Sequence, residues 1–411
     1  MLLTLAGIGY FAFALLAAGR FLAERRAPHV AFAPRVSVLK SLKGLDPGMM
    51  DALRSHCRQS YAGEFELLFG VSSLSDPAAG AVGQLKAEFP SLAIQLIECP
   101  QRLGANGKVS TLIQLAAHAR HDFLLINDSD ITVGPHYLER VIAGFAPGRS
   151  SSGAEESKKM AAEAAQGQSS CVDQCGHHVV EKLSGREVGL VTALYRGRAH
   201  GTLPSRLEEL GIATDFQAAV LLSKWIEGGL HYGLGSTLAV RRATLARMGG
   251  LEGLLDHLAD DYELGARVVA AGYRVALSAE VVETSIPAYS WRGFLDHQLR
   301  WERTVRDVRP WGYAGLIFTH GLAWALINVV LCAASPLSLN LLGVSFLLRM
   351  ALAVVVGWGV LADPQVLPGL WLVPLRDLVA MAVWAAGFAG STIVWRGERF
   401  ALKNGKLSRI E

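Results

Sequence analysis

Long apolar runs lie near both ends of this 411-residue chain, and a charged block separates them. Residues 1 to 22 are almost free of charge, and further apolar segments follow at about 313 to 334, 337 to 361 and 370 to 395. A helix needs about 20 apolar residues to cross the hydrocarbon core of a bilayer. The pattern therefore predicts one N-terminal membrane segment, a polar domain, and about three C-terminal membrane segments.

The N-terminal segment is interpreted as a retained transmembrane anchor over residues 1–24. Arg25 and Arg26 follow the apolar run, whereas no Lys or Arg opens it. A cleaved signal peptide is the alternative, because residues 17–19 are small, but such a peptide begins with a positive region. Positive residues that flank a membrane segment stay in the cytoplasm, so the domain that follows is expected to be cytoplasmic.

The C-terminal segments, over residues 313–395, raise a conflict about sidedness. Three crossings from a cytoplasmic domain would place the C-terminus outside, yet residues 396–411 form a basic tail that favours the cytoplasm. One segment is therefore expected to lie at the interface or to re-enter the membrane. The start of the third segment is the predicted position, because prolines interrupt it and irregular backbone needs protein cover there. These prolines are Pro364, Pro368 and Pro374.

Short apolar runs alternate with helical patterns over residues 33–310, which predicts a single α/β domain. The alternation indicates a mostly parallel sheet with helices on both faces, and such sheets bind ligands beyond the C-terminal ends of their strands. Strands are expected at residues 36–42, 65–71, 93–97, 123–126, 188–194 and 236–240, and helices at 49–59, 78–89 and 109–118.

Residues 147–186 break this alternation, and their serines, alanines and paired charges predict a mobile inserted loop. The loop contains Cys171, Cys175, His177 and His178, whose side chains suit zinc, but their spacing matches no common zinc finger. The five cysteines of the chain predict no disulfide framework, and its net charge of +3 does not indicate nucleic-acid binding.

Two glycine-containing segments approach known nucleotide-binding motifs but lack required residues. Residues 104–108 end like a phosphate-binding loop, but Arg102 stands where the upstream glycine is needed and Val109 replaces Ser or Thr. Residues 233–235 lack the third glycine of a dinucleotide-binding motif. Neither segment therefore predicts such a site.

Asp128 and Asp130 follow the apolar run 123–126, where a buried strand would reach the edge of the sheet. Two carboxylates in this position can share Mg²⁺ or Mn²⁺, which commonly combines one or two carboxylates with substrate phosphates. A turn is the alternative, because Asp and Asn also satisfy backbone groups at strand ends.

Asp260 and Asp261 open a helical pattern that continues through Leu264 and Val268. The acids could simply cap the helix and complement its dipole. A transfer to a hydroxyl group also needs a base, and a positioned carboxylate can supply one. Asp261 is the predicted base.

Residues 297–301, with sequence His-Gln-Leu-Arg-Trp, precede the C-terminal apolar segments on a polar helical pattern. A basic patch beside anionic lipid is one interpretation. Arg300 beside Trp301 also offers a fork for phosphate oxygens next to a surface on which an acceptor can stack. The two interpretations are compatible.

In this order, the sites resemble those of membrane glycosyltransferases with a GT-A fold, specifically the ceramide glucosyltransferase family and its bacterial hopanoid-biosynthesis relatives. The resemblance spans most of the chain outside the inserted loop. It is carried by residues 36–44, 104–108, 128–130, 235–237, 259–262 and 300–301, and for the hopanoid-associated members by 191–197 and 309–315.

The resemblance implies a role for each matched residue. It assigns nucleotide-sugar contacts to Lys40, Asp76, Lys108 and Asp128, and metal binding to Asp128 and Asp130. It assigns base catalysis to Asp261, and closure over the diphosphate and acceptor to His297, Arg300 and Trp301. Two positions depart from the family pattern. Ser73 replaces an acid that often precedes the acid-proline pair, and His297 replaces Gln or Arg, which makes the charge of that position depend on pH.

The implied activity is an inverting transfer of N-acetylglucosamine from UDP-GlcNAc to bacteriohopanetetrol at the bacterial inner membrane, with Mg²⁺ or Mn²⁺ as cofactor. Ceramide glucosylation from UDP-glucose and a catalytically inactive lipid-binding scaffold are the alternatives. A processive polysaccharide synthase is less consistent with the sequence, because about three downstream segments are too few to form a polymer channel. Short motifs do not encode the choice of sugar or lipid.

Overall fold

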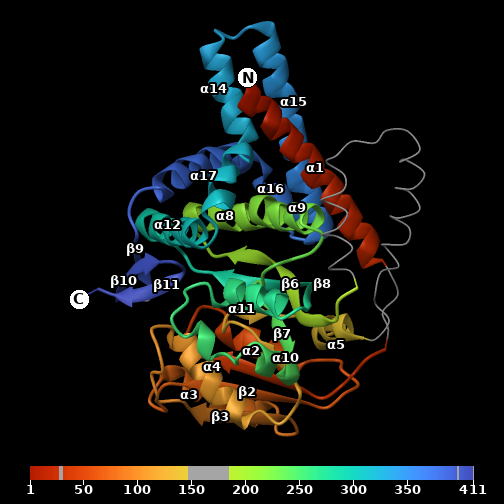
Figure 1. The fold of residues 1–411 in the computed structure, drawn as a ribbon, viewed down its shortest axis with the longest axis vertical. Helices are drawn as coiled ribbons and strands as arrows, with labels where there is room; N and C mark the ends of the chain where they lie inside the picture. Colours follow the sequence, from red (N-terminus) through yellow and green to blue (C-terminus); the bar gives the residue numbers. More distant parts are fainter. Residues whose placement is uncertain (27–30, 147–184, 396–397, 411) are drawn as a thin grey trace.

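The computed structural model describes residues 1–26, 31–146, 185–395 and 398–410. Figure 1 shows three levels along its long axis: a sheet domain, a layer of helices that lie across the molecule, and a group of projecting helices. The sheet domain carries the polar residues, and the projecting helices carry exposed apolar side chains. Most of the inserted loop, including its cysteines and histidines, lies outside the described residues.

The sheet has eight strands in the order β3-β2-β1-β4-β7-β6-β8-β5. β1, β2, β3 and β4 run parallel, as do β6 and β8, whereas β7 is antiparallel to both β4 and β6. The strands are β1 (Val36–Ser41), β2 (Phe65–Val71), β3 (Ala93–Glu98), β4 (Phe123–Ile126), β5 (Ile131–Thr132), β6 (Val188–Ala199), β7 (Leu238–Arg241) and β8 (Arg274–Ile286). The sheet is thus mixed and mostly parallel.

Buried side chains follow each other along β1, β2 and β4, as expected for strands that helices cover on both faces. α4 packs on β1 and β2, and α3 packs on β2 and β3. The helices of this domain are α2 (Met49–Cys57), α3 (Pro77–Glu88), α4 (Gly107–His118), α5 (Tyr137–Ile142), α10 (Arg242–Arg247) and α11 (Asp260–Ala270), with short turns η1 (Ala143–Phe145) and η4 (Glu252–Leu254).

The expected strands and helices all occur, with small shifts at their ends, and the predicted α/β class is confirmed. The long strand β8 was not among the expected strands. Its polar and apolar residues alternate imperfectly, and it joins the sheet between β6 and β5. Its position depends on pairing with distant β6, which no local pattern reveals.

A layer of helices separates the sheet from the projecting part (Figure 1). α8 (Leu203–Gly211) continues through the π-helical turn η3 (Ile212–Phe216) into α9 (Gln217–Ile226), and α12 (Trp291–Val308) crosses beside it. α8 packs on β6 and on α12. This layer brings residues from two distant parts of the chain above the C-terminal edge of the sheet.

Three described helical segments are long and apolar enough to cross a membrane: Leu2–Arg25, Pro336–Val360 and Val366–Gly387. A fourth is possible if Pro310–Phe318 and Gly321–Leu331, which are bent by 52°, form one span. The corresponding elements are α1 (Leu2–Arg25), α13 (Pro310–Gly315), η5 (Leu316–Phe318), α14 (Gly321–Leu331), α15 (Pro336–Ala353), η6 (Val354–Val360), α16 (Val366–Gly369), η7 (Leu370–Leu372) and α17 (Val373–Gly387).

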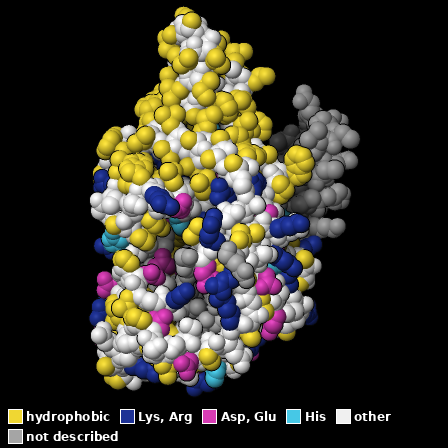
Figure 2. Space-filling view, turned by 90° about the vertical axis from the view of Figure 1, so that its left-hand side faces the viewer, with side chains coloured by type: hydrophobic (Ala, Val, Ile, Leu, Met, Phe, Trp, Pro, Cys, Tyr) yellow, Lys and Arg dark blue, Asp and Glu magenta, His cyan; other side chains and the backbone are white. Residues whose placement is uncertain are grey.

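α1, α14 and α15 pack against each other and project from the molecule, whereas α17 lies across their direction and packs on α12 and α8 (Figure 1). Figure 2 shows hydrophobic side chains covering this projection, with the charged side chains gathered below it. α14 and α15 form a hairpin, so the chain returns to the side of the sheet domain. The protein is therefore membrane-associated through these apolar helices.

The C-terminal region differs from the expected basic tail. Three strands in this region form an antiparallel sheet: β9 (Thr392–Trp395), β10 (Glu398–Lys403) and β11 (Lys406–Arg409). The expected third membrane segment ended at residue 395, but the helix ends at Gly387 and β9 belongs to this small sheet. Alternating buried side chains of β10 and β11 pack on the sheet domain. Because exposed basic residues lie between them, the sequence pattern did not indicate this packing.

Candidate active site

Asp128 and Asp130 lie directly after β4, at the C-terminal edge of the sheet, as the sequence predicted. The neighbouring Asn127 is buried and holds this strand end in place: its amide nitrogen donates to Tyr137 Oη at 2.8 Å and to the Ser236 carbonyl at 2.6 Å. Asp130 accepts a hydrogen bond from Thr284 Oγ1 of β8 at 2.5 Å. Contacts from α5, from the segment before β7 and from β8 thus position the loop that carries the two carboxylates.

The donor chemistry of this carboxylate pair fits a hard divalent cation. Burial raises the pKa of Asp130, and the charge of Asp128 raises it further. A cation would relieve this repulsion, and carboxylate oxygens are the ligands that Mg²⁺ and Mn²⁺ prefer. The described residues form no cluster of three or more acidic, His or Cys ligands, so substrate oxygens would have to complete the coordination.

Lys108 joins two of the predicted motifs. It lies in the first turn of α4, which Asn106 caps by accepting a hydrogen bond from the Val109 N–H. Its Nζ lies 2.8 Å from Asp128 Oδ1 and 3.1 Å from Asp260 Oδ2. Burial alone would lower the pKa of Lys108, but Asp128 and Asp260 raise it above its usual range, so the ammonium stays charged.

Asp261 lies in the first turn of α11, beside these carboxylates. Its Oδ2 accepts a hydrogen bond from the Gly235 N–H at 2.8 Å, and its Oδ1 accepts one from the Tyr262 N–H at 2.8 Å. A Cβ atom at Gly235 would lie 3.1 Å from Asp261 Oδ2 and 3.4 Å from Asp128 Oδ2, so this glycine backbone lies between the two carboxylates. Burial, and then the charge of Asp260, raises the pKa of Asp261 to about 6.

Lys40 is fully buried at the end of β1, and its ammonium donates to the backbone carbonyl of Asp128 at 2.9 Å. Burial lowers the pKa of Lys40 to about 7, against the opposing effect of Asp130 and Asp128. In the structure, this lysine therefore supports the loop that carries the two carboxylates.

Asp76 is held apart from this group by other hydrogen bonds. It caps α3 by accepting from the Ala78 N–H at 2.9 Å, and it accepts from the Gly44 N–H at 2.9 Å. Ser73, the departure from the family pattern, hydrogen-bonds to Ser75 at 2.9 Å. The observed contacts give Asp76 a structural role, and its contact with a nucleotide remains a prediction.

His297 and Trp301 lie one turn apart on α12 and face a partly exposed group of aromatic residues. The rings of His297 and Trp301 are 5.1 Å apart, and Trp301 lies 6.1 Å from Phe216. Phe216 lies 5.8 Å from Tyr195, and the charges of Asp261 and Asp128 act on the Tyr195 hydroxyl. A continuous row of rings therefore leads from the helix layer to the carboxylates.

Two residues that contact His297 of α12 were not among the predicted site residues. The buried carboxylate of Glu208 lies 3.1 Å from His297 Nδ1, and Tyr289 stacks on the His297 ring at 5.5 Å. Arg300 lies close enough to Tyr289 for its charge to act on the tyrosine hydroxyl. Glu208 gave no signal in the sequence, because its helical pattern is that of an ordinary amphipathic helix.

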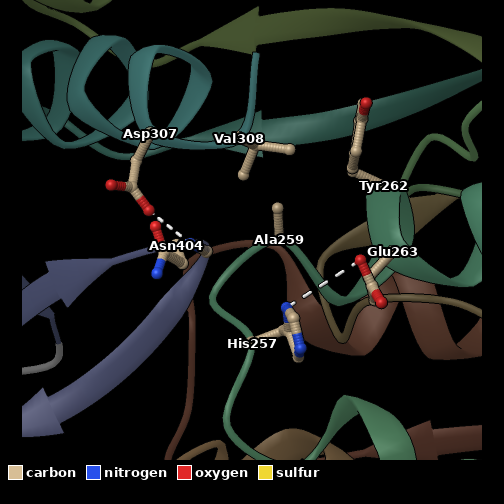
Figure 3. A pocket seen from close by; sticks show the side chains of 8 residues that line it. His257, Ala259, Tyr262, Glu263, Asp307, Val308 and Asn404 are labelled. Atoms are coloured by element: carbon tan, nitrogen blue, oxygen red, sulfur yellow. Dashed lines mark hydrogen bonds and ion pairs between the residues drawn. The ribbon is translucent and has the colours of Figure 1, made fainter. Parts of the chain in front are cut away.

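A pocket of about 310 Å³ adjoins the Asp260–Asp261 turn. Figure 3 shows its lining from α11, the end of α12 and the β10–β11 turn. The lining residues are His257, Ala259, Tyr262, Glu263, Asp307, Val308, Asn404 and Gly405. The small C-terminal sheet thus forms one wall beside the helix that carries the predicted base.

Backbone contacts attach this C-terminal sheet to the segment before Asp260. The Leu407 N–H donates to the Asp256 carbonyl at 2.7 Å, and the Leu258 N–H donates to the Gly405 carbonyl at 3.2 Å. Arg303 of α12 donates to the Thr392 carbonyl at 2.7 Å. The sheet therefore connects the α12 motif to the turn of the predicted base.

Comparison with known proteins finds a family model and relatives that match most of the chain. The model of glycosyl transferase family 21 matches residues 1–153 and 172–408. Ceramide glucosyltransferases 3 and 1 of Caenorhabditis elegans are each 22% identical, over 380 and 386 residues, and cover 90% of this chain and 73% and 72% of their own.

A solved structure also shares the fold. The mannosyltransferase PcManGT from Pyrobaculum calidifontis, in complex with GDP-Man and Mn²⁺, superposes with a TM-score of 0.50 and 16% identity. The match covers 94% of this chain and 97% of the other. The superposition supports a common GT-A fold, and at 16% identity the match carries no information about the substrates of this chain.

Proposed function

Since the chain belongs to glycosyl transferase family 21 and is a nucleotide-sugar glycosyltransferase that acts on a lipid, we propose that it transfers the sugar of a UDP-sugar to a membrane lipid hydroxyl with inversion. One observation carries the proposal: Asp128, Asp130 and Asp261 meet at the sheet edge, and a row of aromatic side chains connects this edge with η3, which packs on the apolar segments α15 and η6. The scaffold alternative does not account for this arrangement of charged groups.

The proposed reaction is a single displacement. Asp261 takes the proton of the lipid hydroxyl, the hydroxyl oxygen bonds to the anomeric carbon, and the bond from that carbon to the UDP oxygen breaks. The raised pKa of Asp261 suits a base that works near neutral pH. Lys108 holds Asp128 and Asp260 in place and offers its positive charge to the departing diphosphate.

Asp128 and Asp130 would hold the divalent cation, Mg²⁺ or Mn²⁺. When bound, this cation neutralises negative charge on the diphosphate. Arg300 and Trp301 would close over the diphosphate and the acceptor, with His297 held in place by Glu208. Lys40 and Asp76 would support the nucleotide from the strand ends.

For the substrates, we propose N-acetylglucosamine from UDP-GlcNAc and the hopanoid polyol bacteriohopanetetrol. Residues 191–197 and 309–315 support this choice through their resemblance to hopanoid-associated transferases. Transfer of glucose to ceramide is the second candidate, because the C. elegans relatives are ceramide glucosyltransferases.

We also propose that the sheet domain and the C-terminal sheet both face the cytoplasm at the bacterial inner membrane. The hairpin of α14 and α15 returns the chain to its starting side, and α17 would lie at the interface. This arrangement accommodates both the basic C-terminal residues and the arginines after α1. The proposed interfacial helix begins at the prolines that mark the start of the expected third segment.

The test is to incubate the purified full chain with Mg²⁺ or Mn²⁺, a panel of UDP-sugars, and both lipids, and to identify products by mass spectrometry. We expect one sugar per lipid, with the anomeric configuration inverted. Product with ceramide and none with the hopanoid polyol would overturn the proposed acceptor. Absence of any glycolipid across the panel would overturn the proposed function.

A further inference from the structure

A group of polar side chains is buried where the projecting helices meet the helix layer, away from the catalytic carboxylates. Arg349 of α15 is at its centre and is 1% exposed. It donates two hydrogen bonds to Asp377 of α17 at 2.8 Å and two to Thr214 of η3 at 3.1 and 3.2 Å. The hydrogen bonds of this guanidinium thus join α15, α17 and η3, and they hold the surrounding helices together.

Arg376, the neighbour of Asp377, is also buried but is only partly used. One of its terminal nitrogens donates to Gln298 of α12 at 3.2 Å. Its Nε and its other terminal nitrogen have no hydrogen-bond partner among the described residues. A Cβ atom at Gly211 would lie 2.3 Å from Arg376 Nε, so the absence of a side chain at Gly211 allows the guanidinium to enter the helix layer.

Three further buried atoms in this region lack a hydrogen-bond partner within the described part of the chain. They are Tyr10 Oη of α1, Glu302 Oε2 of α12 and His320 Nε2 at the start of α14. Asp215 is close enough to act electrostatically on all three side chains. Unsatisfied buried groups are rare in folded proteins, and a local concentration of them calls for a ligand or another explanation.

The group adjoins the row of aromatic rings. Asp215 immediately precedes Phe216, and both residues are partly exposed. On α12, Gln298 and Glu302 lie one position after His297 and Trp301, so they occupy the adjacent face of the same helix. The polar group and the aromatic row are therefore next to each other in the helix layer.

The charges of the group indicate what it would bind. Arg349 and Asp377 neutralise each other, the charge of Arg376 acts on Glu302, and Asp215 adds a second acid near Glu302. Burial raises the pKa of Glu302 to about 7, which also makes this carboxyl available as a donor near neutral pH. No net positive charge remains to favour a phosphate, whereas hydrogen-bond donors and acceptors are both available.

We propose that Tyr10, Arg376, Glu302 and His320 form a subsite for the uncharged polar head of the acceptor lipid, which carries several hydroxyl or amide groups. This inference rests on the proposed function, because only that function makes the bound lipid the acceptor of the sugar. The subsite holds the head by hydrogen bonds while its reactive hydroxyl extends along Phe216 and Trp301 toward Asp261.

Two hydroxyl deletions on α1 provide a matched test. Tyr10→Phe removes a hydroxyl that has no hydrogen-bond partner among the described residues, and Thr4→Val removes one that donates to the Trp324 carbonyl at 3.3 Å. Binding of short-chain ceramide and of bacteriohopanetetrol to the full chain in detergent is measured by calorimetry, together with thermal unfolding. We expect Tyr10→Phe to weaken lipid binding about two- to tenfold without lowering thermal stability.

Thr4→Val is expected to lower thermal stability and to leave lipid affinity unchanged. Equal lipid affinity in Tyr10→Phe and the original chain would overturn the subsite and leave the polar group merely hydrated. Tighter binding of phosphatidic acid than of either neutral lipid would also overturn it. Because the readout is binding, a chain that binds neutral lipid through Tyr10 but forms no glycolipid would contradict only the proposed function.

Discussion

The ammonium group of Lys108 lies 2.8 Å from the carboxylate of Asp128 and thereby ties the start of α4 to the loop after β4. The two residues are 20 positions apart, and neither motif alone indicates the pair. The same ammonium reaches Asp260, so the lysine organises both acidic motifs. Its removal should therefore affect more than one step of the reaction.

Lys108→Met is expected to lower kcat/KM for the UDP-sugar by about 10²-fold, because a charge aimed at the diphosphate is lost and two carboxylates lose their partner. Steady-state kinetics with the best donor and lipid would measure the effect. Lys108→Arg should recover part of the activity. Activity of Lys108→Met within about twofold of the original would contradict this role.

Asp261→Asn should reduce kcat by about 10² to 10⁴-fold, because the amide cannot accept the proton of the lipid hydroxyl. UDP-sugar binding, measured by calorimetry, should persist. The matched control is Glu263→Gln on the same helix, where the carboxylate pairs with Arg267 at 2.7 Å. Retained turnover in Asp261→Asn would show that another group acts as the base.

The pH profile should report the environment of Asp261. A base works only when deprotonated, so kcat is expected to fall as the pH drops through about 6, the raised pKa of this buried carboxyl. Asp260→Asn removes a neighbouring negative charge and should shift the acidic limb to lower pH. A limb that stays in place or moves upward in this variant would be inconsistent with the assignment.

The C-terminal sheet should be necessary for an ordered active site. Leu402→Ala leaves a cavity beneath the buried cluster of Leu258, Phe400 and Leu407, and is expected to destabilise this region by about 2 to 5 kcal/mol. Lower kcat and a lower temperature of unfolding would follow. Lys403→Ala, at an exposed position of the same strand, is the control and should change neither quantity.

The buried pair of Arg349 and Asp377 offers a stability test. Arg349→Met leaves Asp377 buried without its partner and should cost about 3 to 5 kcal/mol in unfolding free energy. Combining Arg349→Met with Asp377→Leu should recover most of that loss, because neither member of the ion pair is then left buried without its partner. Thermal unfolding of the two variants and the original chain in one detergent checks the prediction, and a double variant less stable than Arg349→Met would refute it.

Local patterns were sufficient for the elements that carry the site. The apolar run 123–126 placed Asp128 and Asp130 at a strand end, and the helical pattern after Asp261 placed this acid in a first turn. Such inferences succeed because burial repeats with the period of a strand or a helix. Phe216 of the aromatic row and Glu208 beside His297 were not identified from the sequence, because their local patterns are those of ordinary helices.

The sequence by itself determined the order of the motifs, the α/β class, and the apolar segments, since each depends on residues that are neighbours in the chain. Only the tertiary structure decided that Lys108 bridges Asp128 and Asp260, that Glu208 holds His297, and that the basic C-terminal residues form a sheet beside the active site. These contacts join segments far apart in the sequence. They arise from the packing of whole elements against each other, which no local period encodes.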